Sequence, residues 1–276
     1  MAAPLNQVFF PASFPELFSS WERFPDAVPY AGGSGFIHNH GKYNLILPNI
    51  ILSLDNIKEL FKVTRTERYL EIGAMVNLNH ITLLGKVVPD ILRQCLDQIT
   101  SPQIKNIATI GGNICNKTRL LDTAIPMVAL DAQYELRNQQ FSRWISASRF
   151  HAVSELPVLN PRELLSRIRI PLFQWDYSLY KKFFNYKNSG VIFVFLLKIE
   201  KNLLTNIRVV FQYRSIFRDK NSESLLINKQ LPLNHRDSDN FMDSFSLFLS
   251  ENTVISDFNR KKLLNYMYLA INNFTS

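Results

Sequence analysis

Apolar residues at the start of the chain change from strand-like to helix-like spacing. Val8–Phe10 is a short apolar run, and Ser13 is a suitable N-cap for the stretch that follows. This stretch is predicted to be an amphipathic helix, because its large apolar residues fall on one face. They are Phe14, Leu17, Phe18, Trp21 and Phe24. Two further short strands are expected at Ala27–Ala31 and at Leu45–Leu47, just before Pro48.

The middle of the chain mixes both kinds of spacing. Tyr69–Gly73 is predicted to be a strand paired with the segment around Phe61–Thr64. Ser101-Pro102 interrupts the helical pattern. The other expected elements are helices at about Leu78–Leu84, Val88–Ile99 and Thr123–Leu130, and strands at Tyr134–Arg137 and Leu165–Ile170.

The pattern changes after Pro171, where strand-like runs follow one another with short connections. Such a succession favours an antiparallel meander. The expected strands are Leu179–Tyr186, Val191–Glu200 and Leu203–Tyr213, the last two joined at Lys201-Asn202. Helices with one apolar face are expected at Phe241–Leu249 and Asp257–Asn272.

The length of 276 residues suits one large domain with a smaller one appended. We place the boundary at Pro171, which gives a first domain of residues 1–171, with subdomains of about 1–55 and 56–171, and a second of 172–276. The predicted class is α+β, with a three-stranded antiparallel sheet and helices in the second domain. Hydrophobic residues make up 46% of the chain and charged residues 20%, which is typical of a globular protein with a buried core.

Composition disfavours several classes of function. The most apolar run, Val191–Ile199, is too short to cross a bilayer, and no signal peptide is recognisable, so we expect a cytoplasmic protein without membrane contact. The net charge is +8, but Lys and Arg alternate with acids, so no nucleic-acid partner is expected. Cys95 and Cys115 cannot supply the four thiolates of an iron–sulfur cluster. His38 and His40 lack a metal-ligand spacing and are expected in a loop.

The first glycine-rich segment is Ala31–Gly35, directly after a predicted strand. Consecutive residues without a Cβ let the backbone approach a ligand and turn successive N–H groups toward an anion. The spacing is neither that of a Rossmann fingerprint nor that of a Walker loop. An ordinary tight turn and a phosphate site therefore both remain open.

The second glycine-rich segment is Gly111–Asn113, which follows Thr109 and precedes an apolar helical run. Its N–H groups are also candidates for a phosphate. Asp122 lies near the start of the next helix, where it acts either as an N-cap or as an acceptor for sugar hydroxyls. Two such segments about eighty residues apart suit a pyrophosphate held from two sides, and a nucleotide or dinucleotide site is the resulting hypothesis.

The sequence also resembles the flavoprotein subunits of the molybdenum hydroxylases, which include xanthine dehydrogenase, aldehyde oxidase and carbon monoxide dehydrogenase. Ala108–Ile114 followed by Asp122 is similar to the second FAD motif of that family. Ala31–Ser34 lies where the family has its first pyrophosphate loop, and Leu70–Ala74 and Gln103–Asn106 match neighbouring segments. The resemblance implies FAD as the cofactor and a two-part FAD-binding domain of the p-cresol methylhydroxylase type.

The resemblance further implies roles for individual residues. Asp122 would hold a sugar hydroxyl, Leu165 would line the flavin pocket, and Lys182 would lie near the isoalloxazine. A cation there would stabilise reduced, anionic flavin. The pyrophosphate would be held by Pro29, Tyr30, Ala31, Gly32, Gly33, Ser34, Gly35 and Phe36 together with Thr109, Ile110, Gly111, Gly112 and Asn113.

The same resemblance implies two partners, a molybdopterin-binding large subunit and a 2Fe-2S small subunit. Electrons would pass from the clusters through FAD to NAD or another acceptor. The chain departs from the family pattern at Gly35, at Lys117–Leu121, at Tyr186 and at Ile99. Two alternatives therefore stay open: a degenerate, cofactor-free scaffold subunit of such a complex, and a stand-alone FAD oxidoreductase of the same fold.

Overall fold

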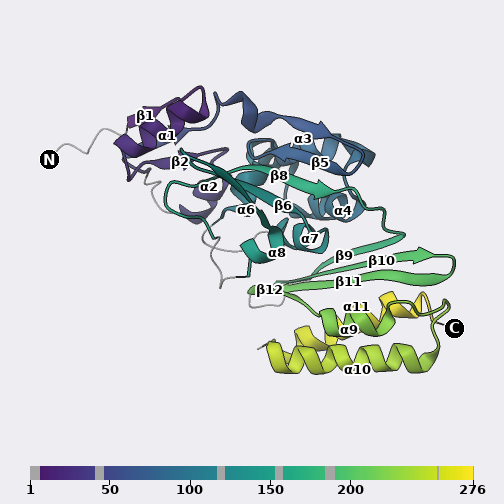
Figure 1. Ribbon diagram of the computed structural model, residues 1–276. Coiled ribbons are helices and arrows are strands. Elements are labelled where there is room, and N and C mark those ends of the chain that lie inside the picture. The colour runs from purple at the N-terminus through teal and green to yellow at the C-terminus, as the bar shows by residue number, and fades with distance from the viewer. Residues whose placement is uncertain are drawn as a thin grey trace. The chain divides into compact units, whose positions relative to one another are not determined.

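The chain forms two compact units (Figure 1). The first comprises Met1–Val88 and Ile99–Leu172, and the second comprises Pro89–Gln98 and Phe173–Ser276. The computed structural model describes residues 7–40, 47–116, 122–152, 158–183, 190–253 and 255–275. Leu45, Ile46, Lys117–Leu121 and Tyr186, which the sequence analysis singles out, lie outside these ranges.

A small parallel sheet opens the first unit. Its order is β1 (Gln7–Phe9), β3 (Ile50–Ser53) and β2 (Val28–Tyr30). The predicted helix is confirmed as α1 (Phe14–Arg23), and the Ser13 hydroxyl accepts a hydrogen bond from the N–H of Glu16. The expected strand at Leu45–Leu47 lies mostly outside the described residues, and β3 follows Pro48. As the central strand, β3 pairs on both sides, and a proline has no N–H to offer to a ladder.

A five-stranded antiparallel sheet forms the centre of the first unit. Its order is β4 (Val63–Arg65), β5 (Tyr69–Gly73), β8 (Leu164–Pro171), β6 (Gln133–Arg137) and β7 (Ser142–Ser146). Short helices connect these strands: η1 (Lys58–Phe61), α3 (Leu78–Leu83), η2 (Gly85–Val87), α5 (Pro102–Ile107), α6 (Ile110–Ile114), α7 (Ala124–Ala129) and α8 (Ala147–Phe150). The central strand β8 alternates between buried and half-buried residues over its second half, as expected for a strand with one covered face.

Two features of this unit differ from the sequence prediction. Ser101-Pro102 interrupts the helical pattern as predicted, since the preceding helix ends at Ile99, but the helix α5 that begins at Pro102 was not predicted; a proline costs no hydrogen bond in the first turn. The strand β7 was missed because only Ile145 is buried in it, so it shows no apolar alternation. As an edge strand it is held mainly by its backbone pairing with β6.

The second unit contains an antiparallel sheet in the order β12-β11-β10-β9. The strands are β9 (Tyr177–Phe183), β10 (Val191–Glu200), β11 (Leu203–Tyr213) and β12 (Ser215–Arg218). The sheet therefore has four strands, not the predicted three. The additional strand β12 is short and half-buried throughout, and it follows a tight turn at Arg214, whose φ is 62°. Neither glycine nor proline marks that turn in the sequence.

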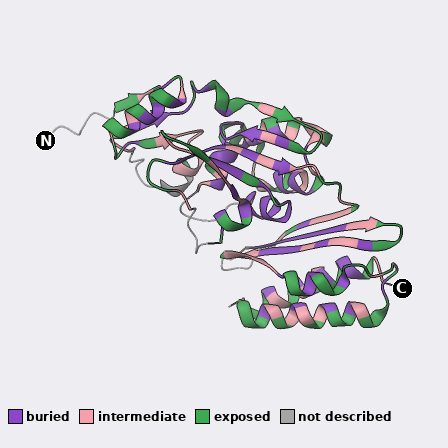
Figure 2. Cartoon of the chain, viewed as in Figure 1, coloured by how far each residue is buried: buried purple, intermediate pink, exposed green. Residues whose placement is uncertain are grey.

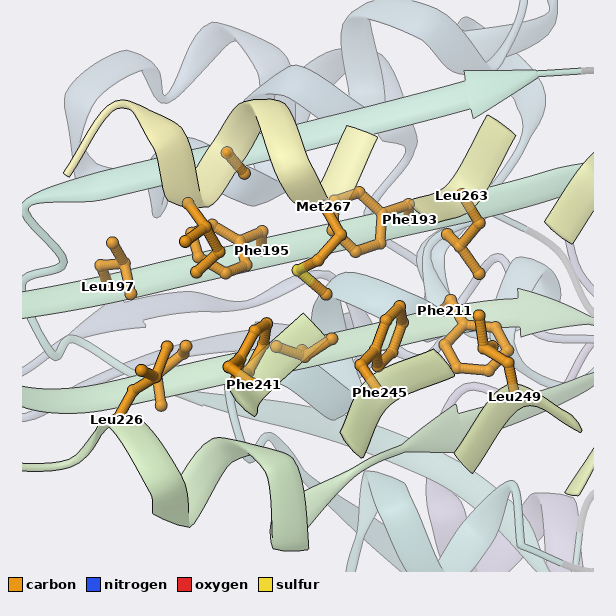
Figure 3. Packing of buried hydrophobic residues seen from close by; sticks show 14 of the residues in the cluster. Phe193, Phe195, Leu197, Phe211, Leu226, Phe241, Phe245, Leu249, Leu263 and Met267 are labelled. Carbon is orange, nitrogen blue, oxygen red and sulfur yellow. The ribbon is translucent and has the colours of Figure 1, made fainter. Parts of the chain in front are cut away.

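Three helices cover one face of this sheet: α9 (Lys220–Leu226), α10 (His235–Asn252) and α11 (Asp257–Asn272) (Figure 1). Phe193 and Phe195 of β10 point toward Phe241 and Phe245 of α10 and Met267 of α11 (Figure 3). All five side chains are fully buried. Figure 2 shows the same division, with buried residues on the strands and on the inner sides of the helices. This core fixes the fold of the second unit.

The helix α4 (Asp90–Ile99) belongs to the second unit, although it lies between first-unit segments in the chain. The side-chain amide of Gln94 donates to the carbonyl of Ser178 at 3.1 Å and accepts from the N–H of Tyr180 at 2.9 Å. Gln94 therefore pairs with the free edge of β9 much as a neighbouring strand would. Among the described residues, no helix has both the length and the apolar character needed to cross a membrane.

Candidate functional site

The first glycine-rich segment is a bend followed by a helix. The bend at Ala31–Gly33 follows β2, and α2 (Ser34–His40) begins directly after it. Gly33 has a φ of 70°, which favours glycine, and its carbonyl accepts the N–H of Ile37 at 3.1 Å. Ser34, Gly35 and Phe36 are therefore helical, and so are His38 and His40, which were expected in a loop. The first turn of a helix leaves its N–H groups without intrahelical acceptors.

The two glycine-rich segments lie side by side. A Cβ on Gly32 would stand 1.5 Å from the carbonyl oxygen of Ile107, two residues before Thr109. A Cβ on Gly35 would stand 3.1 Å from the side-chain nitrogen of Asn116, two residues after α6. Gly32 thus permits a backbone crossing that any side chain would block. The two segments, about eighty residues apart in the sequence, are therefore in close contact, whereas the pyrophosphate held between them stays a prediction.

The second segment differs from the prediction in its hydrogen bonding. It is the short helix α6, and Thr109 is its N-cap, with the Thr109 hydroxyl accepting from the N–H of Gly112 at 3.1 Å. The N–H of Gly111 donates to the Ala74 carbonyl at 2.9 Å. Ile110 and Asn113 likewise donate to the carbonyls of Val76 and Thr109. These N–H groups therefore already have acceptors within the fold, and their contact with a phosphate stays a prediction.

The glycines of α6 instead allow close packing. A Cβ on Gly111 would lie 2.7 Å from the Cβ of Ala74. The helix can therefore approach the segment after β5 only because Gly111 has no side chain. This contact brings Ala74 and Met75 to the same surface as Gly111 and Gly112.

That surface is part of a pocket of about 550 Å³ in the first unit. The volume is within the range usual for small-molecule and cofactor sites. Pro29 and Ala31 of the first segment and Gly111 and Gly112 of the second line it, as does Leu165 of β8. The other predicted residues of the two segments are not part of the lining but lie near lining residues in the chain. They are Tyr30, Gly32–Phe36, Thr109, Ile110 and Asn113.

Several lining residues were not predicted from the sequence. Trp21 of α1, Leu54 after β3 and Met75 after β5 give the pocket an apolar wall. In the sequence, these three residues belong to apolar patterns that indicate a buried core. Such a pattern does not distinguish a core residue from a residue that lines a pocket. Cys115 also lines the pocket.

A turn before β8 completes the wall. Leu159–Leu164 line the pocket, and Arg162 has a φ of 58°. The buried carboxylate of Glu163 accepts two hydrogen bonds from Arg143, at 2.7 and 2.8 Å, and one from the N–H of Asn160 at 3.0 Å. Burial raises the pKa of Glu163, but these donors outweigh burial and hold the pKa below its usual value. In the sequence, Asn160-Pro161 signals a turn without indicating its role.

The structure places the last two predicted residues outside the lining of the pocket. Asp122 is half-buried and precedes α7, whose N-cap is Thr123, so the N-cap role for Asp122 is not realised. The hydroxyl of Thr123 donates to the side-chain oxygen of Asn113, which connects the start of α7 to α6. Lys182 is half-buried on β9 of the second unit.

Comparisons with known proteins agree with this geometry. The model of the family described as "FAD binding domain in molybdopterin dehydrogenase" matches residues 4–173. The carbon monoxide dehydrogenase medium chain of Afipia carboxidovorans is 32% identical over 150 residues, which cover 53% of this chain and 51% of the relative. The xanthine dehydrogenase FAD-binding subunit of Escherichia coli O157:H7 is 26% identical over 159 residues, with the same coverage. The match thus spans about half the length of these relatives.

The likeness in three dimensions extends over the whole chain. A chain of quinoline 2-oxidoreductase from Pseudomonas putida 86 superposes with a TM-score of 0.80 and 20% identity, covering 98% of this chain and 96% of that one. At this identity the match shows the fold alone, and it confirms the predicted α+β class. The family model covers more than half of the chain. This protein therefore belongs to the family of FAD-binding domains in molybdopterin dehydrogenases, and its cofactor is FAD.

Proposed function

We propose that this protein is the flavoprotein subunit of a molybdenum hydroxylase of the xanthine dehydrogenase type. In such a complex it would take electrons from iron–sulfur clusters and pass them to NAD or another acceptor. The observation that carries the proposal is the convergence of both glycine-rich segments and Leu165 on one pocket of about 550 Å³. We also propose a cytoplasmic location, which cell fractionation would test.

The residues of the pocket fit FAD in chemical terms. Gly32 and Gly111 leave space where a Cβ would collide with backbone, so two segments can approach one ligand. Ser34 and Gly35 follow the lining residue Ala31 closely in the chain, and their N–H groups would donate to the pyrophosphate. Trp21, Leu54 and Met75 would exclude water from a flat ring. When bound, FAD supplies the capacity to accept electrons and to transfer hydride.

Asp122 and Lys182 keep the roles that the family resemblance implies, as part of the proposal. Asp122 would bind a sugar hydroxyl through its carboxylate. Lys182 would stabilise the reduced, anionic flavin through its positive charge. Both residues are half-buried, which leaves part of each side chain accessible.

The partners are proposed on chemical grounds as well. The two cysteines, one of them buried, cannot hold an iron–sulfur cluster, so electrons would reach this chain from a 2Fe-2S small subunit. A molybdopterin-binding large subunit would select the substrate. A scaffold subunit without FAD is the competing hypothesis, and FAD content decides between the two.

The pocket assignment is tested by Ala31→Leu, which adds bulk where the first segment lines the pocket. Overpacking should weaken FAD binding roughly tenfold or more. Ala152→Leu is a matched control, because Ala152 is an exposed alanine of the same unit outside the lining. Binding is measured by titrating apoprotein with FAD and following flavin fluorescence. Wild-type protein that takes up no FAD would support the scaffold hypothesis, and equal affinity in Ala31→Leu would contradict the site.

A further inference from the structure

Arg162 has a backbone conformation that its side chain disfavours. Its φ of 58° is in the left-handed region, where a Cβ approaches the following carbonyl oxygen. Glycine or asparagine would occupy this position at lower cost. An unfavourable conformation that persists in a pocket wall motivates a functional hypothesis for the residue that adopts it.

The turn around Arg162 is fixed by its neighbours. The N–H of Glu163 donates to the carbonyl oxygen of Asn160 at 3.1 Å. The carboxylate of Glu163 accepts a hydrogen bond from the N–H of Asn160 at 3.0 Å. The two-pronged contact of Arg143 then anchors the Glu163 carboxylate. The conformation of Arg162 is therefore imposed by the turn, and the position holds its side chain at the pocket.

No acidic residue of the described pocket lining forms an ion pair with Arg162. Among the described residues, Arg162 is the only cation in the lining, and it forms no ion pair. Glu163 is the one acidic residue in the described part of the lining, and it forms an ion pair with Arg143. A mostly apolar pocket with one unpaired arginine favours an anionic ligand.

We propose that Arg162 binds the diphosphate of FAD; this inference rests on the proposed placement of FAD in the pocket. The N–H groups of α6 are already hydrogen-bonded, so the second segment offers the diphosphate few donors. Arg162 would supply donors and positive charge on the pocket wall. A guanidinium suits this task because it binds two phosphate oxygens at once and is always charged.

The test is Arg162→Gly, with Lys201→Gly as a matched control. Lys201 shares the positive charge, the exposure and the left-handed backbone, with a φ of 50°, but lies in the β10–β11 turn of the second unit. Each full-length apoprotein is titrated with FAD and with riboflavin, which lacks phosphate, at several salt concentrations. Thermal unfolding of each apoprotein is recorded as well.

Arg162→Gly should bind FAD about tenfold more weakly, with a shallower salt dependence, and should bind riboflavin as the wild type does. Its unfolding temperature should not fall, because glycine relieves the backbone. Lys201→Gly should leave FAD binding unchanged. An FAD affinity within twofold of wild type, or an equal loss for riboflavin, would overturn the inference. If Ala31→Leu weakens FAD binding while Arg162→Gly does not, only the role of Arg162 fails; if the wild type binds no FAD, the proposed function fails.

Discussion

His151 is a buried titratable residue whose neutral form stabilises the first unit. It is 7% exposed, and its Nε2 lies 3.3 Å from the hydroxyl of Tyr134. Burial lowers the pKa of His151 to about 4. In the unfolded chain the pKa is about 6.5, so the unfolded state binds the proton first as the pH falls. The resulting stability is fully present above about pH 6.5 and is lost as the pH falls toward 4.

We therefore expect the free energy of unfolding to decrease by up to about 3 kcal/mol between these two pH values on account of His151. His151→Gln should flatten this part of the profile, because glutamine does not titrate. His80→Gln, at an exposed histidine of the same unit, is the control and should retain the wild-type slope. Urea unfolding across the pH range measures the effect, and parallel profiles for wild type and His151→Gln would contradict it.

At the scale of elements, Gln94 connects α4 to the free edge of β9. Gln94→Leu would leave the carbonyl of Ser178 and the N–H of Tyr180 without this partner. We expect a loss of about 1–2 kcal/mol in the free energy of unfolding, and faster hydrogen exchange at the Tyr180 amide. Gln98→Leu, at an exposed glutamine of the same helix, should leave both unchanged. Equal exchange rates at Tyr180 in the two variants would rule out this role.

The helices and strands differ in how well the sequence alone predicts them. The helix α11 and the strands β10 and β11 were predicted with their observed bounds, because long apolar patterns and a polar turn define them locally. The strand β12 and the helices α2 and α6 were missed, since tertiary contacts determine them. Gly111 is helical because α6 packs against Ala74, a contact that no local pattern encodes.

Prediction of the site from the sequence is limited in the same way, because tertiary contacts determine which residues line the pocket. The glycine-rich segments were found from the residues themselves and Leu165 by resemblance, and the structure brings residues of both segments and Leu165 to one pocket. Arg162 was not found, because its proposed role depends on a left-handed turn that is held by Glu163, directly before β8, and by Arg143 of β7.

At the scale of the molecule, the residues that line the pocket belong to the first unit, so a substitution in the lining leaves the residues of the second unit unchanged. Cofactor loading and assembly should therefore be separable. Tagged protein purified from its native host should carry molybdenum- and iron-containing partners, and Ala31→Leu should retain these partners while losing FAD. Metal analysis and flavin content measure the two properties independently.

Electron transfer then identifies the role of the chain. The Ala31→Leu complex should still reduce its metal centres with substrate but should pass electrons to NAD or another acceptor much more slowly, because FAD is the proposed outlet. Ala152→Leu should match the wild type in both steps. Wild-type turnover by the Ala31→Leu complex would show that electrons leave by another route. Native protein that purifies alone, without molybdenum or iron, would contradict membership in the complex and would leave the stand-alone oxidoreductase as the function to test.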